Sequence, residues 1–395
     1  MLRFLRMFSD RTNWKLTRNR LTETLEEVRS SGARVLDLTL SNPTRAGLHY
    51  DETRILEALA SPQSMDYDPH PKGLSVARAA VAAYYHTVHG LRDFDPERLI
   101  LTTSTSEGYS FVFRLLCNPG DELLVPKPSY PLFEFLADLQ DVRLVPYQLI
   151  YDHGWQMDFP WLQKAVTRRT RGVVVVHPNN PTGSYVHLNE KELLNRFCRE
   201  HDLALIADEV FIDYAHKGVL QGSFAANQDA LTFTLSGVSK ISALPQMKVA
   251  WIATSGPAAQ VNAAQARLEV IADTYLSMNA PIQWALPAML EQRKSIQQQL
   301  LDRVLGNLAE LDHQLAAQKT CQRLIVEGGW YAILRVPVTQ TDDELAVDLL
   351  RERLVLVHPG HFYDFPRDGY LVLSLITPEI EFAEGMKRLL LAISH

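Results

Sequence analysis

Residues 231–235, Leu231-Thr232-Phe233-Thr234-Leu235, form a short apolar run that leads directly into Ser236-Gly237-Val238-Ser239-Lys240. Two similar runs come earlier in the chain: residues 173–176 are all valine, and residues 203–207 read Leu203-Ala204-Leu205-Ile206-Ala207. Apolar runs of this length that alternate with helical patterns are typical of buried parallel strands. The sequence therefore predicts an α/β fold with a mostly parallel central sheet.

Polar side chains follow each of these three runs. Asn180 lies in the cluster after the valines, Asp208 directly follows the second run, and Lys240 follows the third. Ligands on open α/β sheets bind beyond the carboxyl ends of the strands. We therefore expect the amide, the carboxylate and the amine to meet at one edge of the sheet and to form an active site.

The composition excludes several classes of protein. The 395 residues are 46% hydrophobic and 22% charged, which is ordinary for a globular chain that could hold two or three domains. The formal net charge of -7 disfavours binding to nucleic acids, which are polyanions. No stretch of 18 apolar residues occurs, so no membrane span is predicted.

The cysteines and the start of the chain indicate a compartment. Cys117, Cys198 and Cys321 are widely spaced and form no CxxC pair. This usage suits a reducing environment, and we expect a cytoplasmic protein. Arg3 and Arg6 interrupt the apolar start of the chain too early for a signal peptide.

Hydrophobic periodicity and turn residues predict the other elements. Helices are expected at 18–31 and at 73–90, where Gly90 is the stop, and strands and helices alternate from about 98 to 255. Residues 257–318 have long helical sequence, in which Pro281 and Pro287 are expected to act as breaks. The remaining predictions are strands at 34–40, 322–326, 331–336 and 370–376, a helix near 341–353 and a final helix.

This order of elements predicts a domain organisation. Residues 1–48 are expected to form an N-terminal arm and part of a small domain, and residues 49–284 a large domain with the central sheet. Residues 285–395 would complete a smaller α+β domain, which both chain ends therefore build.

Short motifs distributed along the chain give the site a chemical interpretation. Each is weak evidence alone, and their order and spacing together carry the argument. The motifs are Leu38-Thr39-Leu40-Ser41-Asn42-Pro43, Tyr67 with Gly73, Ser104-Thr105-Ser106-Glu107, Pro119-Gly120-Asp121-Glu122, Pro128-Ser129-Tyr130-Pro131, Asn179-Asn180-Pro181-Thr182-Gly183, Asp208-Glu209-Val210, Ser239-Lys240 and Pro359-Gly360. In these motifs the chain resembles, over nearly its whole length, the class I/II aminotransferases of the fold-type I enzymes that depend on pyridoxal 5'-phosphate (PLP), such as aspartate aminotransferase.

The resemblance implies roles for individual residues. Lys240 would form an imine with the PLP aldehyde and later act as the base that moves the substrate proton. Asp208 would pair with the protonated pyridine nitrogen, and Asn180 would donate to the ring oxygen O3'. Tyr130 would stack on the ring. The other residues implied to contact the cofactor are Ser104, Thr105 and Ser106 at a helix N-terminus, Phe211, Ser239, Lys248, and Tyr67, which would reach the phosphate in the partner subunit of a homodimer.

Plainer interpretations of the same residues exist. Lys240 could be a solvated surface lysine, or one half of a Ser239–Lys240 nucleophile pair, although the chain lacks the oxyanion-hole motif of such hydrolases. Asp208 could cap a helix. It is not expected to bind a metal together with Glu209, because adjacent strand residues point to opposite faces. No metal site is predicted.

Two further sites have plain interpretations of their own. The hydroxyls of residues 104–106 could simply cap a helix. Lys248 could be a solvated lysine on the surface.

Several positions depart from the pattern of the family that the chain resembles. Phe211 stands where many members have a tyrosine, Lys248 where they have an arginine, and Gly237 where they have a serine, with Ser236 displaced by one. Val372 stands where the family arginine grips the substrate α-carboxylate. The cofactor site is thus largely intact, whereas the substrate site is altered.

Val372 leaves two possibilities for the substrate. Another cation could replace the missing arginine, and Arg367 or His361 in the loop before residue 370 are the candidates, with Asn42 as a further substrate-binding residue. Alternatively, the amino carbon of the substrate carries no carboxylate, because an unpaired carboxylate beside a buried valine would cost several kcal/mol. The second possibility is preferred.

The resulting prediction is a PLP-dependent aminotransferase that moves an amino group between an amino acid or amine and a keto or aldehyde acceptor, in a biosynthetic process. An α,β-eliminating PLP lyase is the first alternative, because the same site serves both reactions. A non-catalytic PLP-binding protein with a degenerate substrate site is the second.

Overall fold

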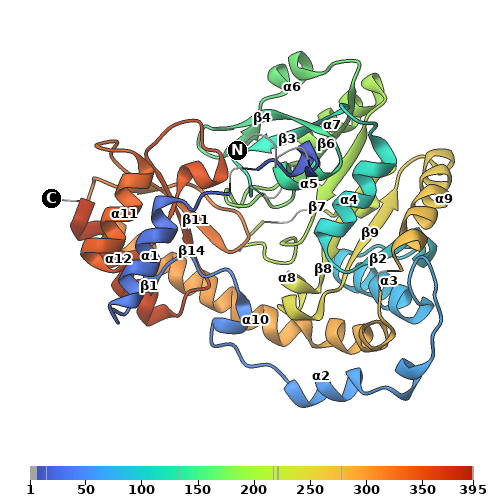
Figure 1. Cartoon of the computed structure of the whole chain (residues 1–395), viewed down its shortest axis with the longest axis horizontal. Helices are drawn as coiled ribbons and strands as arrows, with labels where there is room; N and C mark the ends of the chain where they lie inside the picture. Colours follow the sequence, from blue (N-terminus) through green and yellow to red (C-terminus); the bar gives the residue numbers. More distant parts are fainter. Residues whose placement is uncertain are drawn as a thin grey trace.

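A computed structural model describes residues 7–14, 16–131, 133–216, 218–219, 222–276 and 278–393 (Figure 1). The arginine-containing start of the chain, residues 1–6, lies outside this part. Most of the described chain is built around one large sheet. Its strands, in spatial order, are β2 (Leu99–Thr102), β9 (Ala250–Ser255), β8 (Thr232–Gly237), β7 (Ala204–Asp208), β6 (Thr170–Val176), β3 (Glu122–Lys127), β4 (Arg143–Tyr151) and β5 (Trp155–Met157).

This sheet is mostly parallel, as predicted. β8, β7, β6, β3 and β4 run in one direction, whereas β9 is antiparallel to both of its neighbours and β5 is antiparallel to β4. Helices α4 (Thr105–Leu116), α5 (Phe133–Leu139) and α9 (Ala258–Tyr275) bury one face, and α6 (Phe159–Ala165) and α7 (Leu188–His201) bury part of the other. Because both faces are covered, the central strands are almost continuously apolar.

The second part of the molecule contains a smaller antiparallel sheet. Its strands in spatial order are β10 (Gln322–Arg323), β11 (Tyr331–Arg335), β14 (Tyr370–Ser374) and β13 (His358–Pro359). A separate parallel pair joins β1 (Leu36–Asp37) to β12 (Val355–Leu356). The predicted strand at 34–40 is therefore only two residues long.

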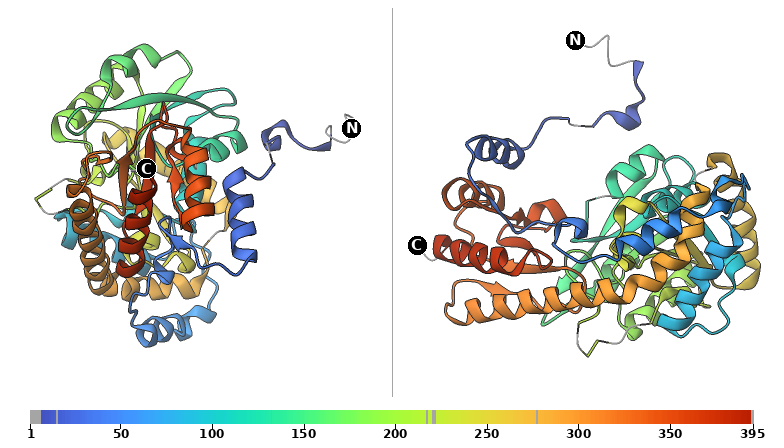
Figure 2. Two further views of the ribbon diagram at one scale, coloured as in Figure 1. Left: turned by 90° about the vertical axis from the view of Figure 1, so that its left-hand side faces the viewer. Right: turned by 90° about the horizontal axis from the view of Figure 1, so that it is seen from below.

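Both ends of the chain contribute to this second part. Helix α1 (Arg20–Ser30) lies beside α11 (Asp342–Arg353), and α12 (Glu379–Ile393) packs against both α11 and the long helix α10 (Figure 2). Leu38, near the N-terminal end, is fully buried against Gly385 of α12, where an added Cβ would lie 2.9 Å from the Leu38 side chain. The N-terminal segment is thus an integral part of the smaller core.

Helix α10 (Ala280–Ala316) connects the two parts. It contacts α2 (Glu52–Leu59) and α3 (Ser75–His89) at one end and α12 at the other. Pro281 lies in its first turn, where the missing N–H has no helical partner in any case. The predicted break at Pro287 is wrong: the helix continues through it, because the buried neighbours Leu286 and Met289 pack in the core formed with α3.

The predicted domain limits cannot be assigned from these contacts alone. The boundary at residue 284 falls inside α10, which is shared by both parts, so the division into arm, large domain and small domain stays a prediction.

Within the described ranges, no helix is both long and apolar enough to cross a membrane.

Asn307 links α10 to the smaller sheet and provides a test of this packing. Its buried Nδ2 donates to the carbonyl oxygens of Leu375 (2.9 Å) and Thr377 (2.7 Å). Asn307→Ala leaves two buried acceptors without a donor, so we expect the free energy of unfolding to fall by about 2–4 kcal/mol. Urea denaturation measures the change. Gln298→Ala, on an exposed side of the same helix, is the control, and an equal loss in both variants would contradict the assignment.

Candidate active site

Lys240 lies just beyond the carboxyl end of β8, in the single-turn helix α8 (Val238–Ile241). Gly237 begins this turn, and the backbone of β9 approaches it closely: an added Cβ would lie 2.7 Å from the carbonyl oxygen of Val249. No side chain fits there, which explains why the serine of the family pattern is absent at this position. Ser236 does not take its place, because its hydroxyl is buried and donates to the Glu209 carbonyl oxygen (3.2 Å).

The Lys240 amine lies in an aromatic environment close to one carboxylate. Its Nζ is 4.9 Å from the ring centre of Trp330 and 5.4 Å from that of Phe211. Burial lowers the pKa of Lys240 to about 8, and the negative charge of Asp208 opposes this shift. About a tenth of the amine is therefore unprotonated at pH 7, far more than for an exposed lysine, and this is the form that attacks a carbonyl carbon.

Asp208 ends β7 and has two hydrogen-bond donors. The Val210 amide donates to Oδ1 (3.1 Å) and the Tyr109 hydroxyl to Oδ2 (2.9 Å). Burial raises the pKa of Asp208, whereas these two donors and the Lys240 charge lower it. A carboxylate has about four acceptor positions. Capacity therefore remains for a further donor such as a protonated ring nitrogen. The residues after Asp208 form a turn, so the helix-cap interpretation is wrong.

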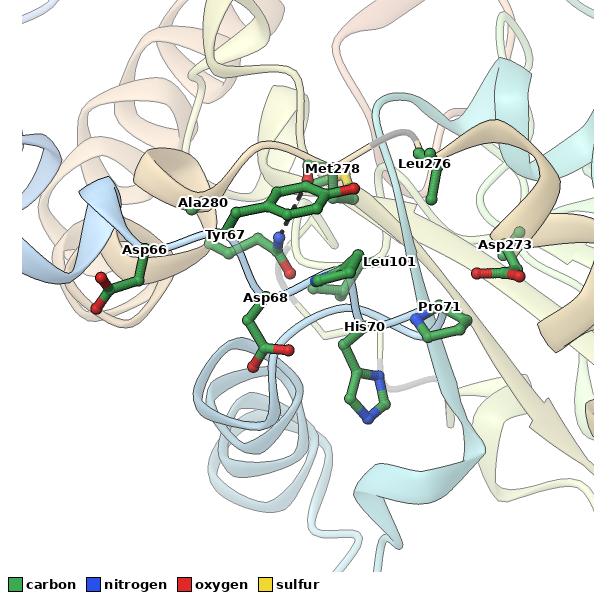
Figure 3. A pocket seen from close by; sticks show the side chains of 13 residues that line it. Asp66, Tyr67, Asp68, His70, Pro71, Leu101, Asp273, Leu276, Met278 and Ala280 are labelled. Atoms are coloured by element: carbon green, nitrogen blue, oxygen red, sulfur yellow. Dashed lines mark hydrogen bonds between the residues drawn. The ribbon is translucent and has the colours of Figure 1, made fainter.

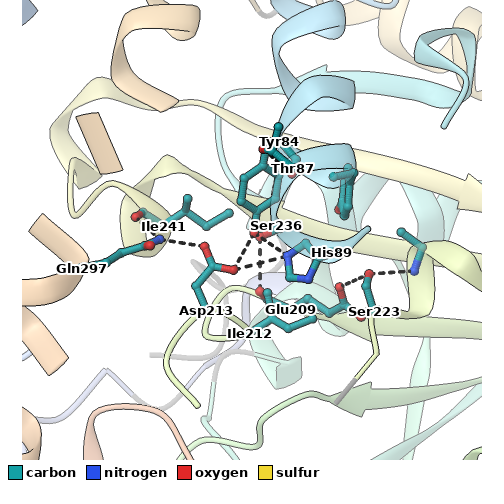
Figure 4. Close-up of polar contacts among 12 residues, drawn as sticks. Tyr84, Thr87, His89, Glu209, Ile212, Asp213, Ser223, Ser236, Ile241 and Gln297 are labelled. Atoms are coloured by element: carbon teal, nitrogen blue, oxygen red, sulfur yellow. Dashed lines mark hydrogen bonds and ion pairs between the residues drawn. The ribbon is translucent and has the colours of Figure 1, made fainter. Parts of the chain in front are cut away.

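A polar network under α8 holds the lysine turn in place (Figure 4). The Tyr214 hydroxyl donates to the carbonyl oxygen of Lys240 (2.6 Å). Gln297 Nε2 donates both to the carbonyl oxygen of Ile241 (2.8 Å) and to Asp213 Oδ2 (2.7 Å). The turn that carries Lys240 is thus anchored to α10 and to the loop after β7.

The same network reaches the end of α3. Asp213 Oδ1 accepts a hydrogen bond from the Tyr84 hydroxyl (2.9 Å) and lies 3.3 Å from His89 Nε2 (Figure 4). Sequence reasoning missed Asp213, as it missed Tyr109, because these partners are distant in the chain and no local pattern marks them.

Glu209 points away from Asp208, as strand alternation predicts. Its buried carboxylate accepts hydrogen bonds from the Ser223 hydroxyl (2.6 Å) and the Phe224 amide (2.5 Å), and burial raises its pKa to about 7. Among the described residues there is no group of three or more His, Cys, Asp or Glu side chains arranged to hold a metal ion.

Asn180 follows β6 and offers an unused amide. Its Oδ1 is buried without a hydrogen-bond partner in the described structure, and so is Nδ2 of Asn179. Asn179 Oδ1 is bonded to the Thr182 hydroxyl (3.0 Å), which fixes the turn, and Gly183 has a left-handed backbone with φ +65°. A buried polar group without a partner is costly, so the Asn180 amide is suited to a polar atom of a ligand.

Residues 104–106 lie at the start of helix α4, which packs against β8 and β9. Ser104 is its N-cap, with Oγ accepting from the Glu107 amide (3.2 Å), and Thr105 and Ser106 are half-buried in the first turn. Gly108 allows α4 to approach β8, since an added Cβ would lie 2.7 Å from the Leu235 side chain. The capping interpretation is confirmed for Ser104. Anion binding uses the same helix end and stays a prediction.

The other residues assigned to the cofactor are more exposed. Tyr130 is half-exposed in the loop after β3, whose Ser129 amide donates to the Tyr363 carbonyl oxygen (2.9 Å). Ser239 is half-buried in α8 beside Lys240. Lys248 is exposed and has a left-handed backbone with φ 54°. Its contact with a phosphate stays a prediction.

Tyr67 lies in an exposed loop that precedes α3 in the chain. Together with Leu276 and Met278 it lines a pocket on the molecular surface (Figure 3). Within the described residues, Tyr67 makes no hydrogen bond or ring contact with Lys240, Asp208 or Asn180, and its role at a partner subunit stays a prediction.

The predicted substrate-binding residues are separated from the lysine. Val372 is buried on β14, opposite Ile333 and His358. Arg367 is exposed, and its Nη2 donates to the Tyr370 hydroxyl (3.2 Å). His361 is exposed, and its Nε2 lies 3.5 Å from Asp343 Oδ2. Asn42 is also exposed, and its Oδ1 accepts hydrogen bonds from the Thr44 amide (3.1 Å) and the Thr44 hydroxyl (2.8 Å).

Comparison with known proteins decides the family. Residues 33–379 match the family described as Aminotransferase class I and II. The chain belongs to this family. It is therefore an enzyme that transfers amino groups, and the prediction drawn from the sequence motifs is confirmed at that level.

Curated relatives cover most of the chain. An alanine aminotransferase of Mycobacterium tuberculosis is 28% identical over 371 residues, which are 91% of this chain and 86% of the relative. The glutamate-pyruvate aminotransferase AlaA of Escherichia coli is 30% identical over 275 residues, 69% of this chain and 67% of the relative. The crystal structure of an aminotransferase from Escherichia coli (24% identity, 98% of both chains) has a TM-score of 0.86. An alanine aminotransferase from Pyrococcus furiosus (22% identity, 98% of this chain and 99% of that one) has a TM-score of 0.90, and both structures show the same fold.

The interaction between Lys240 and Asp208 can be tested by titration. Asp208 raises the pKa of the lysine, so Asp208→Asn should shift it below the value of about 8. The measurement is the labelling of the Lys240 peptide by an amine-reactive reagent in cofactor-free protein, followed by mass spectrometry over a range of pH. Glu200→Gln, an exposed change of equal charge, should leave the midpoint unchanged. A midpoint that stays constant or rises in Asp208→Asn would refute the interaction.

Proposed function

We propose that this aminotransferase works with PLP bound covalently at Lys240. The observation that carries the proposal is a lysine with a lowered pKa that lies beside the rings of Trp330 and Phe211 and near the Asp208 carboxylate. Asn180, whose side-chain Oδ1 makes no hydrogen bond in the described structure, follows the neighbouring strand β6. The donor set fits PLP, which has an aldehyde, a basic ring nitrogen, a ring oxygen and a phosphate.

Each part of this set would bind one part of PLP. Asp208 would hold the protonated ring nitrogen, and the Asn180 amide would donate to the ring oxygen. Ser104, Thr105, Ser106 and Ser239 would bind the phosphate, with Lys248 as an additional cation. When bound, PLP supplies an electron sink that stabilises negative charge on the substrate carbon.

The protein's own residues would control the position and protonation of the reacting groups. Tyr109 would keep the Asp208 carboxylate oriented and ionised, because it donates to Oδ2. The free Lys240 amine would act as the base at the substrate carbon, and the lowered pKa suits proton transfer near neutral pH. Phe211 offers no hydrogen bond, so it would serve as an apolar wall that excludes water from the amine.

The substrates we propose are an amino acid and a keto acid. The names of the curated relatives, alanine aminotransferase and glutamate-pyruvate aminotransferase, support this class. The three cysteines are free thiols, in agreement with the proposal of a cytoplasmic enzyme.

Borohydride reduction tests the role of Lys240. In the PLP-loaded enzyme, reduction should fix the cofactor to the peptide that contains Lys240, and Lys240→Ala should abolish turnover while PLP still binds noncovalently. L-Glutamate should convert the cofactor to pyridoxamine phosphate and release 2-oxoglutarate without ammonia. Label on a different lysine would overturn the assignment. Release of pyruvate and ammonia from L-serine, whose hydroxyl can leave from the β-carbon, in the absence of an acceptor would favour the lyase.

We also propose a homodimer in which Tyr67 reaches the cofactor phosphate of the partner subunit. Tyr67 and Leu276 line the pocket shown in Figure 3. The surface there supports an interface, because Tyr67, Leu276 and the nearby Met65 in the sequence are large side chains with exposures of 80%, 62% and 88%. Exposed groups of this kind mark protein–protein contacts.

A charge placed on this surface tests the dimer. Leu276→Glu should convert the enzyme to monomers and weaken PLP binding by about tenfold or more, because the partner tyrosine is then lost. Light scattering gives the mass and a fluorescence titration gives the dissociation constant. Ile380→Glu, at a more exposed position on α12 in the smaller part (86% against 62% for Leu276), is the control. A Leu276→Glu protein that stays dimeric would place the interface elsewhere.

A further inference from the structure

The face of the smaller sheet that carries Val372 also carries an arginine. β11 and β14 are antiparallel, with Ile333 opposite Val372 and Arg335 opposite Tyr370. Residues two apart on a strand share a face, and so do directly opposed residues. Arg335 therefore lies on the face of Val372, one residue pair further along the sheet, which corresponds to about 6–7 Å.

This face meets the large sheet near the lysine. Tyr331, at the other end of β11, has its ring 6.2 Å from that of Phe211, which in turn lies 5.4 Å from Lys240 Nζ. Arg335 Cζ lies 5.7 Å from the ring of Tyr151 on β4. Starting from Tyr331 beside Phe211 and following the register, the face thus presents Tyr331, then the apolar pair of Ile333 and Val372, and then Arg335.

The Arg335 guanidinium is placed for an anion. Its Nε is buried and makes no hydrogen bond, and none of the ion pairs within the described ranges includes this residue. The cation lies between two rings, 5.7 Å from Tyr151 and 5.9 Å from Tyr370. Aromatic faces stabilise the charge but leave the N–H group without an acceptor. A carboxylate would supply both charge and acceptor.

A second donor without a partner lies close by. Trp155 Nε1 is buried and makes no hydrogen bond in the described structure. Its ring lies 5.2 Å from that of Tyr151 and 6.2 Å from that of Phe365, which stacks on Tyr370 at 4.6 Å. Trp155 also lines a small cavity together with Asn179 beyond the end of β6. Both unused donors therefore lie between the catalytic edge of the large sheet and the smaller sheet.

We propose that Arg335, assisted by the indole N–H of Trp155, binds a carboxylate that is several bonds away from the reacting carbon of the substrate. This rests on the proposed function, because Lys240 marks the reacting end. Val372 and Ile333 form an apolar stretch beside the middle of the substrate, where a carboxylate would find no partner. The substrates are accordingly amino donors or keto acceptors with a distal carboxylate, such as ω-amino acids and dicarboxylic acids.

Binding of an unreactive dicarboxylate provides a test that does not depend on turnover. Calorimetry with glutarate and the PLP-loaded enzyme should show a dissociation constant that rises about 10–100-fold in Arg335→Gln. Arg335→Lys should lose part of the affinity, because lysine keeps the charge without the planar pair of donors. Trp155→Phe should weaken binding less, and Arg353→Gln, which removes an exposed cation of α11, should have no effect.

A pair of donors that differ only in the carboxylate tests its position. With γ-aminobutyrate, the concentration that gives half-maximal conversion of the cofactor should rise about 10–100-fold in Arg335→Gln. With n-butylamine, which lacks the carboxylate, the wild type and the variant should behave alike.

Several outcomes would overturn the proposal. These are equal glutarate binding by wild type and Arg335→Gln, an equally large effect of Arg353→Gln, or a variant in which both amines are weakened alike. The last result would assign Arg335 a structural role. Failure of the proposed function can be recognised separately. Borohydride reduction would then leave Lys240 unlabelled, whether or not Arg335 binds a carboxylate.

Discussion

The site depends on one electrostatic arrangement: a lysine amine and an aspartate carboxylate that lie near each other in a largely dehydrated part of the protein. Burial disfavours both charged forms, and each group partly restores the charge of the other. Two donors, Val210 and Tyr109, fix the carboxylate. The network of Tyr214, Gln297 and Asp213 fixes the turn of the amine. The amine can therefore be neutral at a pH at which an exposed lysine is protonated.

Much of this arrangement could be predicted from sequence. The strands β6, β7 and β8 are apolar runs, and the rule that ligands bind at their carboxyl ends identified Asn180, Asp208 and Lys240. Periodicity also located α1, α3 and α11, with Gly90 in the left-handed conformation expected of a helix stop. These features are local, so a single segment contains enough information to predict them.

The parts that could not be predicted depend on contacts between distant segments. Tyr109 is 99 positions from Asp208 along the chain, and no local pattern marks it as a partner. Arg335 escaped notice because it ends an ordinary apolar strand, and only the register with β14 places it on the face of Val372. Pro287 was misread for a related reason: the cost of one proline inside a helix is local, whereas the packing that offsets it comes from α3.

The continuity of α10 has a mechanical consequence. Its 37 residues span about 55 Å and belong to both parts of the molecule. The two parts are therefore joined by a continuous helix and not by a flexible linker. Any movement of the smaller sheet toward the lysine must tilt or bend this rod. The rod is weakest near Pro287, where one rung of its hydrogen-bond ladder is missing. A small rotation of the C-terminal part of α10 about this point would produce a larger displacement of the smaller sheet. The side chains of β11 and β14 would then move relative to Lys240.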